Sequence, residues 1–303
     1  MTKARVDIAA SSLARLKNLA GDAHVDFNFL LLRFMQERFL ARLVASPHAE
    51  HFVLKGGVLL LAYGAQGARP TKDIDFLGVN TAHDREHLEQ RVREIASINL
   101  HDGVEFLADS VTSQAIAEDA AYEGVRIKLM AQVGTARNKL QIDVGFGDVV
   151  SPAPLQLDYP TLLEQGTISL RAYSKETMVA EKFEAIVKLA MVNSRMKDFY
   201  DIAFMASEFD FEFSSLALAV LGTFARRETP LENAAALLHS DLTQQASILR
   251  YWNAFGRRLG LKPSETFAKT FSSIRSFLGP VIEAAHSDAA SKQKWDSRAA
   301  TWR

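Results

Sequence analysis

Two aspartates separated by a single residue are the feature of this sequence that most directly suggests chemistry. Asp73 and Asp75 fall in the segment 73–79, which we predict to be a strand. Side chains alternate along a strand, so both carboxylates point to one face while Ile74 and Phe76 point to the core. Two adjacent carboxylates repel each other, and Mg²⁺, which takes one or two carboxylates together with substrate phosphates, relieves that repulsion. The alternative is a pair of solvated residues at the end of a strand.

Two consecutive glycines precede these aspartates. Gly56 and Gly57 follow the strand candidate 51–55 and open a predicted helix that ends at Gly64. Glycine lets a backbone approach a phosphate closely, and a helix N-terminus offers free N–H groups and a positive dipole end. We predict that the two glycines bind the phosphates of a nucleoside triphosphate, although the same pair also suits an ordinary turn. Arg69 and Lys72, in the loop before the aspartates, are either phosphate ligands or solvated charges.

A third carboxylate, Asp143, lies in the strand candidate 140–146, where it alternates with Ile142 and Val144. Aspartate is depleted from strands, so its presence here indicates a functional role. Phosphoryl-transfer sites with two metal ions commonly take a further carboxylate from a neighbouring strand. We predict that Asp143 joins Asp73 and Asp75 in binding metal and nucleotide; the alternative is a strand with one half-exposed face.

The elements that must position these residues follow from the apolar pattern. It predicts helix over 7–45 and 84–98 and strands at 51–55, 73–79, 104–107, 125–132 and 140–146. A proline-bearing stretch at 151–154 marks a passage, after which the signals are helical almost to the end, with a frayed tail after Ser287. We expect an α+β (α/β-like) fold divided into an N-terminal helical segment 1–48, a core 49–155 and a helical C-terminal domain 156–303.

The composition limits the classes of function. The chain has 303 residues, a formal net charge of −1 and no Cys, which excludes disulfides, iron–sulfur clusters, cysteine zinc sites and thiol nucleophiles. These features fit a soluble protein of the cytoplasm. No apolar run approaches the roughly 20 residues that span a membrane, and Asp7 stands where a signal peptide needs apolar residues. Near-neutral charge excludes a highly basic nucleic-acid protein but leaves room for a local basic patch.

Five sequence blocks in order carry a resemblance to a known family. They read HFVLKGGVLLLAYG, RPTKDIDFLG, LQIDVGFGD, ETMVAEKFEAIVKLA and SRMKDFYDIAFM. Together they strongly resemble the AbiEii/AbiGii-type toxin nucleotidyltransferases, within the DNA polymerase β-like nucleotidyltransferase superfamily, over about residues 29–209. This resemblance implies a mixed sheet flanked by helices in the core. The stretch between Gly57 and Asp73 is slightly longer than the superfamily's usual spacing, which affects the placement of Arg69.

The resemblance also implies functional residues after position 175. Its motif carries a functional lysine where Lys182 stands, at the edge of an apolar helix stripe whose opposite side, with Glu181, Glu184 and Lys188, should face water. In the family, the first aspartate of the KDFYD block, here Asp198, lies in the active-site cleft with that lysine. Lys182 would suit the triphosphate, and Asp198 would orient Lys182 or act as general base. Asp201, the second aspartate of the same block, is a further candidate for nucleotide binding. The structural alternatives are a helix N-cap for Asp198 and a first-turn residue for Asp201.

The activity implied by the resemblance is transfer of a nucleoside monophosphate from a nucleoside triphosphate to an acceptor, with Mg²⁺ or Mn²⁺ as cofactor and release of pyrophosphate. The implied acceptor is the tRNA acceptor end, and the implied setting is a toxin–antitoxin or phage-defence (abortive-infection) system with a cognate antitoxin. Basic residues (Lys182, Lys188, Arg195, Lys197, Arg226, Arg227, Arg257, Arg258 and Lys262), with Tyr251 and Trp252, offer modest support for RNA. The alternatives are a small-molecule (antibiotic-type) or protein-hydroxyl acceptor, and a non-catalytic nucleotide- or partner-binding module.

Overall fold

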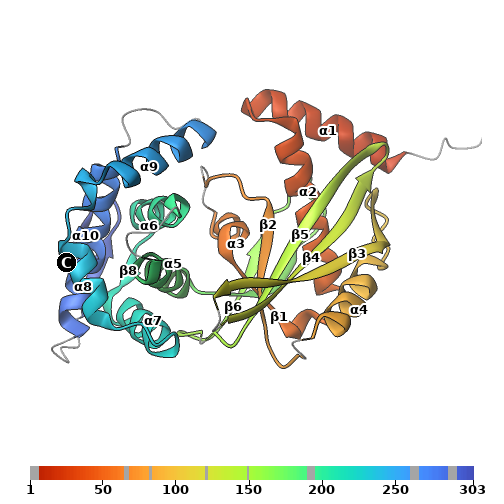
Figure 1. The fold of residues 1–303 in the computed structure, drawn as a ribbon. Coiled ribbons are helices and arrows are strands. Elements are labelled where there is room, and N and C mark those ends of the chain that lie inside the picture. Colours follow the sequence, from red (N-terminus) through yellow and green to blue (C-terminus); the bar gives the residue numbers. More distant parts are fainter. Residues whose placement is uncertain are drawn as a thin grey trace, which may run out of the picture. The chain divides into compact units, whose positions relative to one another are not determined.

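The structure, a computed structural model, describes residues 7–64, 68–81, 84–119, 122–148, 150–189, 195–259, 266–285 and 292–303 (Figure 1). They form two compact units, which are described separately. The first unit comprises the chain up to Gly147 together with Leu155–Ala172, and the second comprises Asp148–Pro154 and Tyr173–Arg303. Within the ranges described, no helix is both long enough and apolar enough to cross a membrane.

The first unit is built on a seven-stranded mixed sheet of order β3-β4-β5-β2-β1-β7-β6. Its strands are β1 (Phe52–Lys55), β2 (Asp73–Gly78), β3 (Val104–Asp119), β4 (Tyr122–Val133), β5 (Ala136–Phe146), β6 (Leu155–Tyr159) and β7 (Ile168–Ala172). β2 runs parallel to β5 and antiparallel to β1, and β1 runs parallel to β7. The sheet therefore brings the glycine-containing segment, the two aspartates and Asp143 onto adjacent strands at its centre.

Four helices accompany this sheet: α1 (Ile8–Ala23), α2 (Phe27–Val44), α3 (Gly56–Ala62) and α4 (Arg85–Ala96). Asp7, Asp26 and Asp84 cap α1, α2 and α4, because each carboxylate accepts a hydrogen bond from a backbone N–H three residues further on. The predicted helical stretch 7–45 is thus confirmed as two capped helices. α3 is short and contacts β1 and β2 (Figure 1).

The second unit is mainly helical, as predicted. Its helices are α5 (Lys175–Leu189), α6 (Met196–Glu208), α7 (Phe213–Arg226), α8 (Leu231–His239), α9 (Ala246–Leu259) and α10 (Phe267–Ala285). A small sheet of β8 (Phe211–Glu212), β9 (Lys294–Asp296) and β10 (Thr301–Trp302) completes it. The prediction of a frayed tail is wrong for residues 292–303: Trp295 is buried, and its Nε1–H donates to the Ala206 carbonyl at 2.7 Å. Residues 286–291 lie outside the described ranges.

The segment 155–172 differs from the expected domain boundary. We expected it to begin the helical C-terminal domain, but β6 and β7 extend the first unit's sheet through pairing of β7 with β1 and of β6 with β7. Their apolar residues Tyr159, Ile168 and Leu170 are buried there. The chain accordingly passes between the units three times, after Gly147, after Pro154 and after Ala172.

A buried carboxyl group gives the first unit a predictable pH response. Glu37 on α2 is fully buried, and its Oε2 accepts the Leu162 N–H at 2.7 Å. Burial raises the pKa of Glu37 to about 7, against the lowering effects of that N–H and of Arg38. Because the folded pKa exceeds the unfolded value, this group's contribution to stability is complete below the unfolded pKa and is lost as pH rises through about 7.

We therefore expect the free energy of unfolding to fall by about 2 kcal/mol as the pH rises from 5.5 to 8.5, because Glu37 ionises over this range. Glu37→Gln should remove most of that pH dependence, because an amide does not ionise. Hydrogen exchange of α2 amides, compared between variant and wild type at each pH, measures the effect. Glu50→Gln is the control, since the Glu50 side chain is 81% exposed. An unchanged pH dependence in Glu37→Gln would contradict the account.

Candidate active site

A row of four charged residues crosses the centre of the first unit's sheet. The strand register pairs Lys55 with Asp75, Asp75 with Asp143, and Asp143 with Arg126. Directly paired residues on neighbouring strands share a face of the sheet, so the four side chains project to the same side. All four are half-buried, and the charges run positive, negative, negative, positive across β1, β2, β5 and β4.

Asp73 lies one step along the same face. It pairs with Gln141 of β5, which in turn pairs with Lys128 of β4. Asp73 and Asp75 are both half-buried, whereas the intervening Ile74 and the following Phe76 are buried. The alternation predicted for this strand is therefore present, and the two carboxylates share the polar face with Asp143.

Asp143 is held by an arginine that the sequence had not singled out. Arg126 Nε donates to Asp143 Oδ1 at 2.9 Å, and Arg126 Nη2 donates to Oδ2 at 2.8 Å. Gln141 Nε2 also donates to Oδ2, at 3.3 Å. A bidentate arginine–carboxylate pair is among the stronger polar contacts in proteins. The structure thus brings Asp143 to the predicted place but engages both of its oxygens.

Gly56 is in close contact with the Asp75 carboxylate. Its φ of +70° is left-handed, and a Cβ added there would lie 2.0 Å from Asp75 Oδ2. Only glycine accommodates both the conformation and the contact. The glycine therefore sets how closely the backbone at the start of α3 approaches Asp75.

We expect Gly56→Ala to displace the Asp75 carboxylate and to lower activity by at least about 100-fold, the scale seen when a group that stabilises a transition state is displaced. Gly64→Ala is the matched control, because Gly64 has a φ of +75° and no described heavy atom within 4 Å of an added Cβ. Both variants carry left-handed strain of about 1–2 kcal/mol. Activity and thermal melting measured on both separate displacement from strain. Equal activity losses would count against the contact as the cause.

The remaining predicted phosphate ligands occupy the segment around Asp73. An added Cβ at Gly57 would lie 2.9 Å from Thr71 Oγ1, so this glycine too permits a close approach. Lys72 is exposed, and its carbonyl accepts a hydrogen bond from Gln36 at 3.0 Å. Arg69 is half-buried, and its guanidinium donates to the Pro70 carbonyl at 3.4 Å. Phosphate binding by these residues stays a prediction.

The second unit holds its own charged cluster. Lys182 Nζ of α5 donates to Asp198 Oδ1 at 3.3 Å and to Asp201 Oδ2 at 2.8 Å, both on α6. The two aspartates are buried and the Lys182 side chain is 12% exposed. Asp198 Oδ2 is buried without a hydrogen-bond partner among the described residues. The structure brings together the three residues predicted in this part of the chain.

The structure rules out one structural alternative in this unit, and one expectation is wrong. Asp198 is not the N-cap of α6; Arg195 occupies that position, and Asp198 lies in the first turn. Glu184 does not face water: it is buried and accepts hydrogen bonds from Arg227 at 2.8 Å and from Thr229 at 2.6 Å. Lys188, by contrast, is exposed as predicted.

The donor set of the first unit fits a magnesium ion held by two carboxylates. Among the residues that the structure describes, no three His, Cys, Asp or Glu side chains come close enough to share one ion. Mg²⁺ needs no such cage, because one or two carboxylates and substrate phosphates suffice. Asp73 and Asp75, two residues apart on one strand face, meet that requirement.

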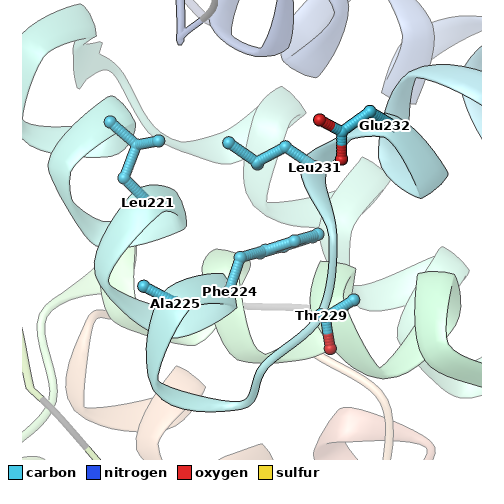
Figure 2. A pocket seen from close by; sticks show the side chains of 6 residues that line it. All are labelled: Leu221, Phe224, Ala225, Thr229, Leu231 and Glu232. Atoms are coloured by element: carbon cyan, nitrogen blue, oxygen red, sulfur yellow. The ribbon is translucent and has the colours of Figure 1, made fainter.

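A cavity of about 380 Å³ lies elsewhere, in the second unit between α7 and the start of α8 (Figure 2). It is lined by Leu221, Phe224, Ala225, Thr229, Leu231 and Glu232. The only ionisable side chain in the lining is a carboxylate, which repels phosphate. The cavity is therefore unsuited to a nucleoside triphosphate.

Comparison with known proteins identifies the family of the chain. The family model described as nucleotidyl transferase AbiEii toxin, type IV toxin–antitoxin system, matches residues 38–277. A comparison with curated proteins gives no match.

Solved structures of similar proteins include MenT4, a nucleotidyltransferase toxin from Mycobacterium tuberculosis, at 18% identity and a TM-score of 0.46, covering 88% of this chain and 94% of that chain. JHP933 from Helicobacter pylori is 14% identical with a TM-score of 0.46, covering 87% of this chain and 95% of that chain. Since the family model spans most of the sequence, including every predicted site residue, the chain belongs to the AbiEii family of nucleotidyltransferase toxins and is a nucleotidyltransferase.

Proposed function

We propose that this toxin transfers a nucleoside monophosphate from a nucleoside triphosphate to the acceptor end of tRNA, in a reaction that depends on Mg²⁺. The observation that carries the proposal is the placement of Asp73 and Asp75 on one half-exposed face of β2, with Asp75 packed against Gly56. Type IV toxin–antitoxin membership implies a nucleotide substrate and a cognate antitoxin. A role in phage defence is part of the same proposal.

Asp73 and Asp75 would hold the metal, and Gly56 would keep the Asp75 carboxylate in its orientation. When bound, Mg²⁺ supplies neutralisation of charge on the triphosphate as an acceptor hydroxyl attacks the α-phosphorus and pyrophosphate leaves. Gly57, Arg69 and Lys72 are proposed to contact phosphate oxygens. Mn²⁺ has similar ligand preferences and would substitute.

Lys182, Asp198 and Asp201 are proposed to serve the same activity. Two buried carboxylates fix the position of the Lys182 ammonium, which we propose to contact the triphosphate. Asp198 Oδ2 is buried without a hydrogen-bond partner among the described residues, although Arg195 Nη1 lies 4.0 Å away, so this oxygen can accept a hydrogen bond from a substrate. Lys182→Met and Asp198→Asn should therefore reduce turnover.

The exposed face of α9 supports an RNA acceptor. Arg257 and Arg258 are exposed, and Tyr251, about two helical turns before Arg258, is 46% exposed. Guanidinium groups bind phosphates, and an exposed aromatic ring can stack on a base. Trp252 is buried, so the expectation that it also stacks on a base is wrong. Lys262 lies outside the described residues.

We expect Arg257→Glu/Arg258→Glu to weaken tRNA binding about tenfold or more and to flatten its salt dependence, because each lost phosphate contact reduces counterion release. Arg85→Glu/Arg298→Glu changes the net charge equally at exposed positions elsewhere and is the control. Filter binding of labelled tRNA over a series of salt concentrations measures both quantities. Equal weakening in the two double variants would assign the effect to overall charge.

The proposed function is tested by one labelled assay. Protein and Mg²⁺ are incubated with total tRNA and each of the four α-³²P-labelled nucleoside triphosphates in turn, with Asp75→Ala as control. Label on tRNA with wild-type protein only supports the proposal and identifies the nucleotide. Label on protein or on small molecules instead of RNA would refute the tRNA acceptor and favour the alternative acceptors.

A further inference from the structure

We propose, on the basis of the proposed function, that Arg126 is a positioning residue that withholds Asp143 from the divalent cation. In this arrangement Asp73 and Asp75 are the cation's protein ligands. Asp143 instead stays beside them as a neutralised carboxylate in the charged row.

The contact geometry is the first support. Both oxygens of Asp143 accept hydrogen bonds from Arg126, at 2.9 and 2.8 Å, and one of them also accepts from Gln141 at 3.3 Å. The Asp143 and Arg126 side chains are 15% and 29% exposed. A bidentate guanidinium occupies the lone pairs that a metal ion would use, so the two cations compete for one carboxylate.

The position of Arg126 is the second support. The register places it directly opposite Asp143 on the neighbouring strand, so the pair is formed within the sheet itself. Asp75 lies opposite Asp143 on the other side, where a like charge would repel it. Arg126 therefore relieves that repulsion without a metal.

The lack of a three-donor cluster in the described part of the chain agrees with this arrangement. Metal affinity rises with the number of carboxylate ligands. If Arg126 restrains Asp143, its removal should create a third ligand and tighten metal binding. If Asp143 is already a ligand, loss of Asp143 should weaken binding.

The experiment measures Mn²⁺ binding to the full chain by electron paramagnetic resonance, without nucleotide. We expect Arg126→Gln to tighten binding by about tenfold. The tightening should disappear in Arg126→Gln/Asp143→Asn, whose affinity should be close to that of wild type because both charges of the pair are removed together. Lys128→Gln removes a positive charge from the same strand and face without touching Asp143, and should change the affinity much less.

Weaker Mn²⁺ binding in Arg126→Gln/Asp143→Asn than in wild type would overturn the proposal, because this variant removes both charges of the pair, and it tests the proposal even if Arg126→Gln alone does not fold. Equal tightening in Lys128→Gln and Arg126→Gln would also overturn it, as would no Mn²⁺ binding by Arg126→Gln. These outcomes concern the affinity of the site for metal. Failure of the proposed function is seen separately, as absence of labelled tRNA.

Discussion

Asp75→Asn is expected to lower nucleotidyl transfer by about 10²- to 10³-fold while the protein stays folded. Removing the charge deprives the metal of a ligand and the transition state of its neutralising cation, and effects of this kind typically amount to two to three orders of magnitude. Stability should be maintained, because Asp75 is half-buried and stands opposite Asp143, whose like charge it repels. Turnover, measured as labelled product, and thermal melting test both parts.

Asp158→Asn is the matched control. Asp158 is an exposed aspartate on β6 of the same sheet, so its substitution removes the same charge outside the charged row. It should retain nearly full activity. Substantial activity in Asp75→Asn would show that the metal is held elsewhere.

Arg227→Met is expected to destabilise the second unit by about 3–5 kcal/mol, the usual cost of removing one partner from a buried charged network. Arg227 contacts Glu184 at 2.8 Å, Asp148 at 3.0 Å and Glu181 at 3.1 Å, and its side chain is 15% exposed. Burial alone would lower the pKa of its guanidinium, but these three carboxylates raise that pKa above its usual value. Loss of Arg227 would leave these three acidic side chains close together and would remove the guanidinium that pairs with all of them.

Urea unfolding followed by tryptophan fluorescence measures this effect, since all three tryptophans, Trp252, Trp295 and Trp302, belong to the second unit. Arg226→Met is the matched control. Arg226 is next to Arg227 on the chain but is exposed, so the substitution should change stability by no more than about 0.5 kcal/mol. Similar losses in both variants would indicate that the network contributes little.

The sequence predicted the elements whose signals are local. The helices of 7–45 have aspartate caps and regular apolar spacing, and the strand of Asp73 and Asp75 alternates over its first four residues, so both are found as predicted. Strands β6 and β7 were missed because the proline-bearing stretch masked their short apolar patterns, and their existence depends on pairing with β1. The C-terminal strands were missed for a similar reason: Trp295 is held by contacts with residues far away in sequence.

The residues of the candidate site also separate into those with a local signal in the sequence and those whose role depends on distant partners. Aspartates and glycines could be named because their residue types are unusual in strands and helix starts. Lys55 and Arg126 could not, because a basic residue in a strand is uninformative until the register places it opposite a carboxylate. The alternation of Arg126 and Lys128 in β4 was the available signal, since it marks a polar face. Glu184 was misassigned to solvent because its partner, Arg227, lies 43 residues away.

The central claim is that the α-phosphorus of a nucleoside triphosphate is transferred to RNA at the site of Asp73 and Asp75. The most direct measurement runs two reactions in parallel, with the same nucleotide labelled at the α- or at the γ-phosphorus, on wild type and Asp75→Ala. The account predicts α-label on tRNA and γ-label in pyrophosphate with wild type, and neither with Asp75→Ala. Label from the γ-position on the RNA would establish a phosphate transfer of the kinase type and contradict the account.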